Sequence, residues 1–144
     1  MKTVKKFELK VNQTEFEQIK ITKSEDAANF IKQFYSDDIE IYESFFILLM
    51  NRSNKIIGYA KISQGGIIGT YVDKKIVLKY VIDSLASGLI IAHNHPSGVL
   101  RPSDEDIKIT KQIAELCKLL ETTLLDHVIL TADSFYSFAD NGKL

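Results

Sequence analysis

The sequence predicts a single-domain α/β fold, an α-β-α sandwich built around a mixed β-sheet. The chain has 144 residues, close to the roughly 150 residues of one typical domain. Stripes of apolar residues at helical spacing alternate along it with short, continuous apolar runs, and this alternation is typical of helices packed on a sheet. The composition, 45% hydrophobic and 26% charged, supports a core that needs no disulfides or structural metals.

The first 21 residues are expected to form a strand extension packed on the domain. Residues 4–11 place Phe7, Leu9 and Val11 on one face and charged residues on the other, which predicts a half-buried strand. Residues 18–21 predict a second short strand that pairs back on the first. Charged and polar residues interrupt the apolar stretch that a secretory signal peptide requires, so no targeting segment is expected.

The next part of the chain predicts one helix followed by two strands. Ser24 is expected to be the N-cap of the helix, with acidic residues in the first turn, where the helix dipole favours anions. The apolar stripe of this helix consists of Ala27, Phe30, Ile31 and Phe34. The continuous apolar run over 45–50 predicts a strand covered on both faces, and residues 56–62 predict the next strand. The loop that follows is marked by Gly65, Gly66 and Gly69.

The second half of the chain continues the alternation of helices and strands. Asp73 is expected to cap a second helix, and Gly88 is expected to end it in a left-handed conformation. Residues 89–92 predict a short buried strand that leads directly into His93. A third apolar stripe at helical spacing runs over 107–120 and includes Cys117, for which we expect a buried packing role. The closing strands are expected at 124–131 and 135–138.

Charge and cysteine content narrow the classes of function. The chain has 18 Lys and Arg against 19 Asp and Glu, and its net charge of -1 provides no global field for nucleic acid or an anionic membrane, although a local basic patch would be compatible with it. No apolar run is long enough to cross a bilayer. The single cysteine excludes an internal disulfide and a Cys-pair metal site, and it favours a reducing cytoplasm.

One segment, from His93 to Asp106, carries the residue types of a metal site. Side chains alternate along a strand, so His93 and His95 project to the same side and can converge on one ion, whereas Asn94 points the other way. Proline and glycine bend the following loop, so a carboxylate from the start of the next helix can return to the same point. Two neutral imidazoles and one carboxylate are the ligands of a catalytic zinc with an open fourth position, where a water is acidified and becomes a nucleophile.

The same residues also fit a purely structural interpretation. Ser103 as N-cap, with Asp106 reaching back to it, forms a capping box, and an isolated His-x-His pair is commonly just two polar loop residues. Capping and metal binding are compatible, because a capped first turn fixes where its carboxylate points. Both histidines leave a buried strand, and the loop returns directly to this helix start, which favours the metal site.

His93-x-His95-Pro96 followed by Ser103-x-x-Asp106 resembles the JAMM motif of the JAB/MPN metallopeptidase family. The extended run His93 to Gly98, the Pro102-Ser103 pair and the segment 125–129 resemble the RadC-like branch in particular. The resemblance covers roughly residues 22–144 and implies the sandwich fold of that family, which is similar to cytidine deaminases. The helix-hairpin-helix segment that often precedes the domain in RadC-like proteins is not expected here, because residues 1–22 are too few for it.

The resemblance also implies a role for each site residue. His93, His95 and Asp106 would bind zinc. Glu43, which lies just ahead of the 45–50 strand, would accept the proton of the bound water. Ser103 would donate a hydrogen bond to the developing oxyanion.

Other polar residues compete for these roles. Glu40 is an alternative general base, but it lies farther from the buried strand and is expected to be solvated. Asp104 and Glu105 are alternative ligands, and we expect them to serve the helix dipole instead. His127 follows Asp126 in a strand, where a histidine is usually structural, and either residue could support the site from behind.

These observations predict a zinc-dependent hydrolase that acts on a peptide or isopeptide bond of a peptide or protein substrate. The alternative is a non-catalytic RadC-like interaction module associated with DNA repair or mobile elements. A zinc nucleobase deaminase would need His-x-Glu and a cysteine pair, which this chain lacks. An iron(II) oxygenase would take its second histidine from far along the sequence, whereas here the two histidines are two residues apart.

Overall fold

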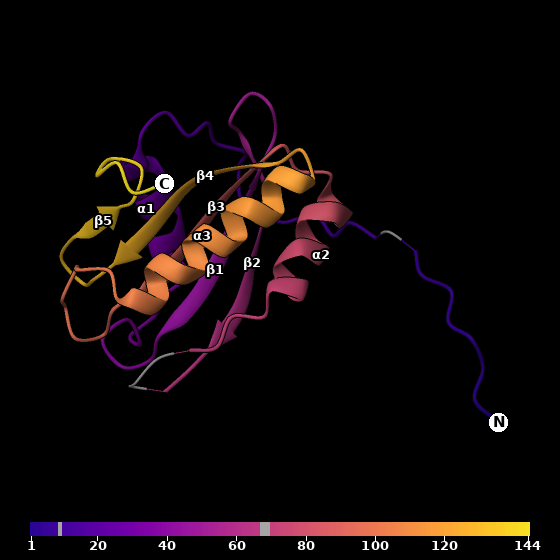
Figure 1. The fold of residues 1–144 in the computed structure, drawn as a ribbon, viewed down its shortest axis with the longest axis horizontal. Helices are drawn as coiled ribbons and strands as arrows, with labels where there is room; N and C mark the ends of the chain where they lie inside the picture. Colours follow the sequence, from indigo (N-terminus) through magenta and orange to yellow (C-terminus); the bar gives the residue numbers. More distant parts are fainter. Residues whose placement is uncertain (9, 67–69) are drawn as a thin grey trace.

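The computed structural model describes residues 1–8, 10–66 and 70–144. In this part of the chain, three helices and five strands form an α-β-α sandwich, as predicted (Figure 1). The helices are α1 (Ser24–Lys32), α2 (Lys74–Ser84) and α3 (Asp104–Leu119). The strands are β1 (Ser44–Met50), β2 (Ile56–Gln64), β3 (Gly88–Asn94), β4 (Thr123–Leu130) and β5 (Phe135–Ser137).

The five strands form one mixed sheet in the order β2-β1-β3-β4-β5. Only β3 and β4 run parallel to each other, and α3 connects them; every other neighbouring pair is antiparallel. A parallel pair requires a crossover connection of a dozen or more residues, and the stretch that contains α3 supplies it. The central strand β3 therefore ends at the loop that leads into the first turn of α3.

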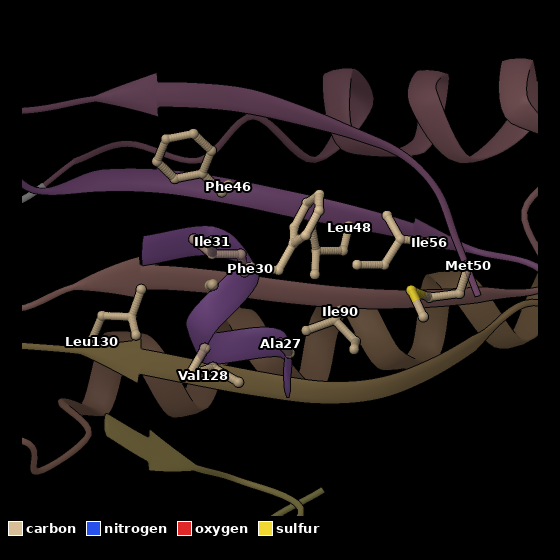
Figure 2. Packing of buried hydrophobic residues seen from close by; sticks show 12 residues of the cluster. Ala27, Phe30, Ile31, Phe46, Leu48, Met50, Ile56, Ile90, Val128 and Leu130 are labelled. Carbon is tan, nitrogen blue, oxygen red and sulfur yellow. The ribbon is translucent and has the colours of Figure 1, made fainter. Parts of the chain in front are cut away.

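The core has two layers, one on each face of the sheet. Helix α1 packs on one face, against alternate residues of β1, β3 and β4 that include Phe46, Leu48 and Ile90 (Figure 2). Helices α2 and α3 pack on the other face, against Phe45, Ile91 and their neighbours. Every residue of β1 and of β3 is buried, which confirms that continuous apolar runs predict strands covered on both faces.

The structure corrects the predicted ends of two helices. Helix α1 begins at Ser24 with Lys23 as its N-cap, because the Asp26 carboxylate accepts hydrogen bonds from the backbone N–H groups of Lys23 and Thr22. Helix α2 ends at Ser84, and its left-handed C-cap is Leu85, with a φ of 54°, and not Gly88. Gly88 is instead the first residue of β3.

Gly88 is needed for space. A Cβ at this position would lie 2.7 Å from Cδ1 of Leu125, which is too close for a carbon–carbon contact. The prediction of a left-handed cap at Gly88 was therefore wrong, and the close approach of Leu125 gives a different reason for a glycine at this position. The predicted N-cap Asp73 is confirmed, since its carboxylate accepts a hydrogen bond from the Lys75 N–H.

The N-terminal extension does not form the predicted strand. In the described residues of 4–11 the backbone is irregular, and Phe7 and Val11 are 86% and 83% exposed, while Leu9 lies outside the described residues. Figure 1 shows this end of the chain running away from the sandwich. An alternating pattern needs a strand partner, and among the described residues of 1–21 the only strand pairing is a single bridge from Lys20 to Lys55. Beside it, the Ile21 N–H donates to the Asn54 carbonyl and the Ile56 N–H donates to the Ile19 carbonyl.

Two further expectations can be checked in the fold. Cys117 is fully buried, as predicted, and burial raises the pKa of its thiol to about 11. None of the helices in the described ranges combines the length and the apolar character needed to cross a membrane. Gly69, the last of the glycines expected in a loop, lies outside the described residues.

Candidate metal centre

The pairing of β1 with β3 brings the predicted general base to the two histidines. Phe45 of β1 lies opposite His93 of β3 in the antiparallel register. Extending that register by two residues places Glu43 opposite His95. Because side chains alternate across a strand, Glu43 shares the α2/α3 face of the sheet with Phe45 and His93.

Three groups predicted as ligands meet at one point. The Nε2 atoms of His93 and His95 lie 3.0 Å apart. The carboxylate of Asp106 completes the triangle, with Oδ1 at 3.1 Å from the first Nε2 and Oδ2 at 3.0 Å from the second. His93 is 2% exposed, whereas His95 and Asp106 are partly exposed, so the triangle lies at the boundary between core and solvent.

The start of α3 fixes the position of the Asp106 carboxylate. Ser103 is the N-cap, and its Oγ accepts a hydrogen bond from the Asp106 N–H at 3.0 Å. In return, Oδ2 of Asp106 accepts from the Ser103 N–H at 2.9 Å, so the predicted capping box is present. The Asp106 carboxylate therefore caps the helix and contacts both histidines at the same time.

Hydrogen bonds determine which nitrogen of each imidazole carries a proton. Nδ1 of His95 lies 2.6 Å from the carbonyl oxygen of Val99, which can only accept, so Nδ1 is the protonated nitrogen. The Thr110 hydroxyl donates to the Asp106 carbonyl at 2.6 Å, and its oxygen therefore accepts from Nδ1 of His127, also at 2.6 Å. That leaves Nε2 of His127 to accept from Nδ1 of His93 at 2.8 Å.

This chain of hydrogen bonds leaves the Nε2 lone pair of His93 facing the triangle. Complete burial lowers the pKa of His127 well below its ordinary value, with the nearby charge of His93 as a further cause, so the chain ends on a neutral imidazole. When His93 and His95 are also neutral, two nitrogen lone pairs and one carboxylate lie 3.0–3.1 Å from one another. Only a shared cation, a proton or a metal ion, offsets their repulsion.

The pKa shifts agree that this point attracts positive charge. Burial opposes ionisation of Asp106, but its hydrogen bonds with His93 and His95 outweigh burial and hold its pKa well below the usual range. Burial likewise lowers the pKa of His95, yet the hydrogen bonds with Asp106 and the Val99 carbonyl raise it overall. The donor set, two imidazoles and a carboxylate, therefore fits a divalent metal ion.

Glu43 lies beside the triangle and extends the group. One ligand atom from each of Glu43, His93 and His95 lies within 4.8 Å of the others, so these three residues could also hold a metal ion. The Glu43 carboxylate accepts a hydrogen bond from the Thr70 N–H at 2.9 Å, and its backbone carbonyl accepts from the Gly65 N–H at 2.8 Å. The Thr70 contact holds the Glu43 side chain beside the imidazoles, and the Gly65 contact holds its backbone.

A cavity of about 290 Å³ opens next to these groups. Glu43, His93 and Asp106 contribute to its polar side, and Phe45 and Ile109 to its apolar side. The remaining lining residues are Thr70, Tyr71, Val72, Lys74, Glu105, Lys108 and Gln112. The site can therefore accommodate part of a chain-like substrate beside the candidate metal position.

The structure shows where each of the alternative site residues lies. Glu40 is exposed, as expected for a solvated residue. Asp104 is also exposed, but Glu105 lines the cavity, so it does more than interact with the helix dipole. Ser103 is exposed and is not part of the described cavity lining; its role as an oxyanion donor stays a prediction. The buried Asp126 carboxylate accepts from Ser137, Ala139 and its neighbour's N–H, and so binds the C-terminal segment instead of the site.

Sequence reasoning missed the contacts that support the site. Thr110 has a local signal, because it lies four residues after Asp106 on the same helix face. Thr70 has none, since its contribution is a backbone N–H. His127, for which support of the site was one of two interpretations, forms a hydrogen bond with Nδ1 of His93 at 2.8 Å.

Comparisons with known proteins agree with the geometry. A family profile described as the RadC-like JAB domain matches residues 21–143. Curated relatives, each named UPF0758 protein, are 44% identical over 123 residues in Flavobacterium johnsoniae and 40% identical over 125 residues in Porphyromonas gingivalis. A third, from Coprothermobacter proteolyticus, is 42% identical over 125 residues. The matches cover 85–86% of this chain and 53–54% of the relatives, so the chain spans about half of their length.

Proposed function

The chain belongs to the RadC-like JAB domain family, and we propose that it is a zinc-dependent hydrolase that cleaves a peptide or isopeptide bond in a peptide or protein substrate. The observation that carries this proposal is the triangle of His93, His95 and Asp106, with ligand atoms 3.0–3.1 Å apart. In a tetrahedral zinc site with metal–ligand distances of about 2.0–2.1 Å, ligand atoms lie about 3.3 Å apart. The distances between the three ligand atoms would therefore have to increase only slightly for zinc to bind.

His93, His95 and Asp106 would hold the zinc, because their donor atoms are the closest to one another. When bound, zinc supplies Lewis acidity, which polarises a carbonyl and acidifies a water molecule. Glu43, at the edge of the same group, is then left free to act as a base. Its hydrogen bond from the Thr70 N–H engages one carboxylate oxygen, Oε2, and Oε1 remains available to accept a proton from water.

The cavity orients the substrate. Its apolar wall, with Phe45 and Ile109, would accommodate a side chain of the substrate, while the polar wall faces the bond to be cleaved. Glu43 would take the proton from the attacking water and deliver it to the leaving amine. The Ser103 oxygen accepts one hydrogen bond from Asp106 and keeps its own proton, which it could donate to the carbonyl oxygen as negative charge develops.

The experiment that tests this proposal combines a metal measurement with a cleavage screen. Purified protein should carry close to one zinc per chain, and His95→Ala should lose most of it; Glu40→Gln, at an exposed residue outside the triangle, should keep it and serves as the comparison. Equal zinc in wild type and His95→Ala would contradict the ligand assignment.

Cleavage of a library of peptides and isopeptides should stop with a chelator and return with added zinc. We expect the fold to survive metal removal, because the core does not depend on the metal. If no chelator-sensitive cleavage is found, while a protein or nucleic-acid partner binds wild type and Glu43→Gln equally well, the chain is an interaction module and the hydrolase proposal fails.

A further inference from the structure

Asn94 lies between the two histidines in sequence but on the opposite face of the sheet. It is completely buried, and its amide has all of its hydrogen-bonding capacity in use. The Nδ2 group donates to the carbonyl oxygens of Ile39 at 2.7 Å and Tyr42 at 2.8 Å. Oδ1 accepts from the Ser44 N–H at 2.8 Å and from the Tyr35 hydroxyl at 3.0 Å.

All four partners of Asn94 belong to one stretch of chain. This stretch is the α1–β1 loop (residues 33–43) and the first residue of β1, Ser44. Tyr42 and Ser44 are the two neighbours of Glu43, so the amide holds the backbone on both sides of that residue. The Tyr35 hydroxyl also lies 3.1 Å from the Ser44 carbonyl oxygen, so its one proton is shared between that oxygen and Oδ1 of Asn94.

We propose that Asn94 is a positioning residue for Glu43: it ties the backbone around the base to the same strand that carries the two histidines. The inference rests on the proposed function, in which Glu43 accepts the proton of water. A base acts only when it is held within hydrogen-bond reach of that proton, and small displacements reduce the rate strongly. Because side chains alternate along β3, His93 lies on the face with Phe45 and the amide of Asn94 on the face with Tyr35, so both parts of the site are attached to one buried strand.

The amide complements the contacts that hold the Glu43 side chain. Thr70 donates to the carboxylate from the α2/α3 side of the sheet. Asn94 holds the backbone from the α1 side. Loss of the amide would leave the part-buried hydrogen bonds to the Ile39 and Tyr42 carbonyls without their donor, which costs free energy unless water replaces it. The loop would then rearrange to reach water, and Glu43 would move with it.

The decisive measurement is hydrogen–deuterium exchange of the full chain loaded with Zn²⁺. Asn94→Asp keeps an acceptor for the Ser44 N–H but replaces the donor group that binds Ile39 and Tyr42. Exchange over residues 33–44 should become about tenfold faster or more, the factor expected when buried hydrogen bonds are lost, while β4 and α3 are unchanged. Zinc affinity should stay near that of wild type, because the Asn94 side chain forms no hydrogen bond with any of the three proposed ligands.

Asn51→Asp is the matched control. The Asn51 side-chain oxygen accepts from the N–H groups of Ser53 and Lys55 at the other end of the sheet, and a carboxylate preserves both bonds. This control should leave exchange over 33–44 unchanged. If Asn94→Asp fails to fold, Tyr35→Phe removes only the hydroxyl and should produce a smaller acceleration in the same residues. A folded variant of either position with unchanged exchange over 33–44 overturns the proposal, and so does a large loss of zinc from Asn94→Asp.

A kinetic measurement separates this inference from the proposed function. With a peptide found in the cleavage screen, Asn94→Asp should lower kcat and leave KM unchanged, and it should lower kcat no further when Glu43 is already Gln. Independent, multiplying losses in the double variant would show that Asn94 acts through something other than Glu43. If Glu43→Gln alone leaves kcat unchanged, the proposed function is wrong, while the exchange experiment still reports whether Asn94 holds residues 33–44 in place.

Discussion

The two carboxylates of the site reach it by different routes. Asp106 lies 11 residues from His95 and is fixed within the first turn of its own helix by the Ser103 capping box. Glu43 is held across the fold, by a Thr70 N–H that is 27 residues away and by the register between β1 and β3. The carboxylate that we propose as a metal ligand is a local feature of the chain, whereas the proposed base is brought to the site only when the sheet has formed.

The largest expected effect concerns the base itself. Glu43→Gln keeps the shape and the acceptor for the Thr70 N–H but cannot take a proton, so turnover should fall roughly 10²–10⁴-fold. Zinc content should stay near wild type, because the triangle is untouched. The exposed Glu40 provides the control, since Glu40→Gln should retain activity. Both are measured by elemental analysis and initial rates. An emptied metal site in Glu43→Gln would make Glu43 a ligand and remove the distinction between the two carboxylates.

A second substitution tests whether the cap of α3 also takes part in the chemistry. Ser103→Ala should lower kcat by roughly 10²–10³-fold if the hydroxyl is an oxyanion donor. It should also cost about 1 kcal/mol of unfolding free energy through loss of the N-cap. Ser103→Thr keeps both the hydroxyl and the cap and should restore rate and stability together. A stability loss without a change in kcat would restrict Ser103 to its structural role.

The support behind His93 gives a smaller expected effect, on the metal alone. Thr110→Val removes the hydroxyl that accepts from His127, so the hydrogen-bond chain to His93 loses its fixed direction. Zinc affinity should fall about 10–100-fold, measured by competition with a chromophoric chelator. Thr110→Ser preserves the hydroxyl and should bind zinc like wild type. Equal affinity in Thr110→Val would show that burial alone orients the imidazole.

The smallest effect comes from a buried carboxylate outside the site. Burial raises the pKa of Asp126 above its ordinary value of 3.8, against hydrogen bonds that would lower it. A carboxyl group with a raised folded-state pKa adds stability that is fully present below its unfolded pKa and is lost as the pH rises through the folded pKa. Urea unfolding from about pH 3.8 upward should therefore show wild type losing stability relative to Asp126→Asn. A constant gap would mean that the hydrogen bonds cancel the effect of burial on this pKa, and a wild type that gains stability relative to Asp126→Asn as the pH rises would mean that they outweigh burial, as they do at Asp106.

The local sequence pattern predicted the fold correctly where a segment is so apolar that it must be buried. The apolar runs that form β1 and β3 are buried on both faces, because exposing either face would place apolar side chains in water. The alternating pattern over 4–11 failed because its outcome depends on an available sheet edge, which the sequence does not specify. The triangle followed from spacing along one strand and one helix start. Glu43 needed the family resemblance, and its partner Thr70 could not be found at all, because any residue provides a backbone N–H.

The central place of β3 also sets how quickly a metal would be exchanged. His93 is fixed in a strand that is hydrogen-bonded on both sides and buried throughout, so it opens only when the core opens. His95 lies just beyond the strand and Asp106 in the first turn of α3, both partly exposed. Dissociation of a bound metal ion should therefore begin with His95 and Asp106, at the loop between them, and His93 should release the ion last. The rate of metal release then reports on fluctuations of that loop, and the half-life of the loaded site becomes independent of global unfolding.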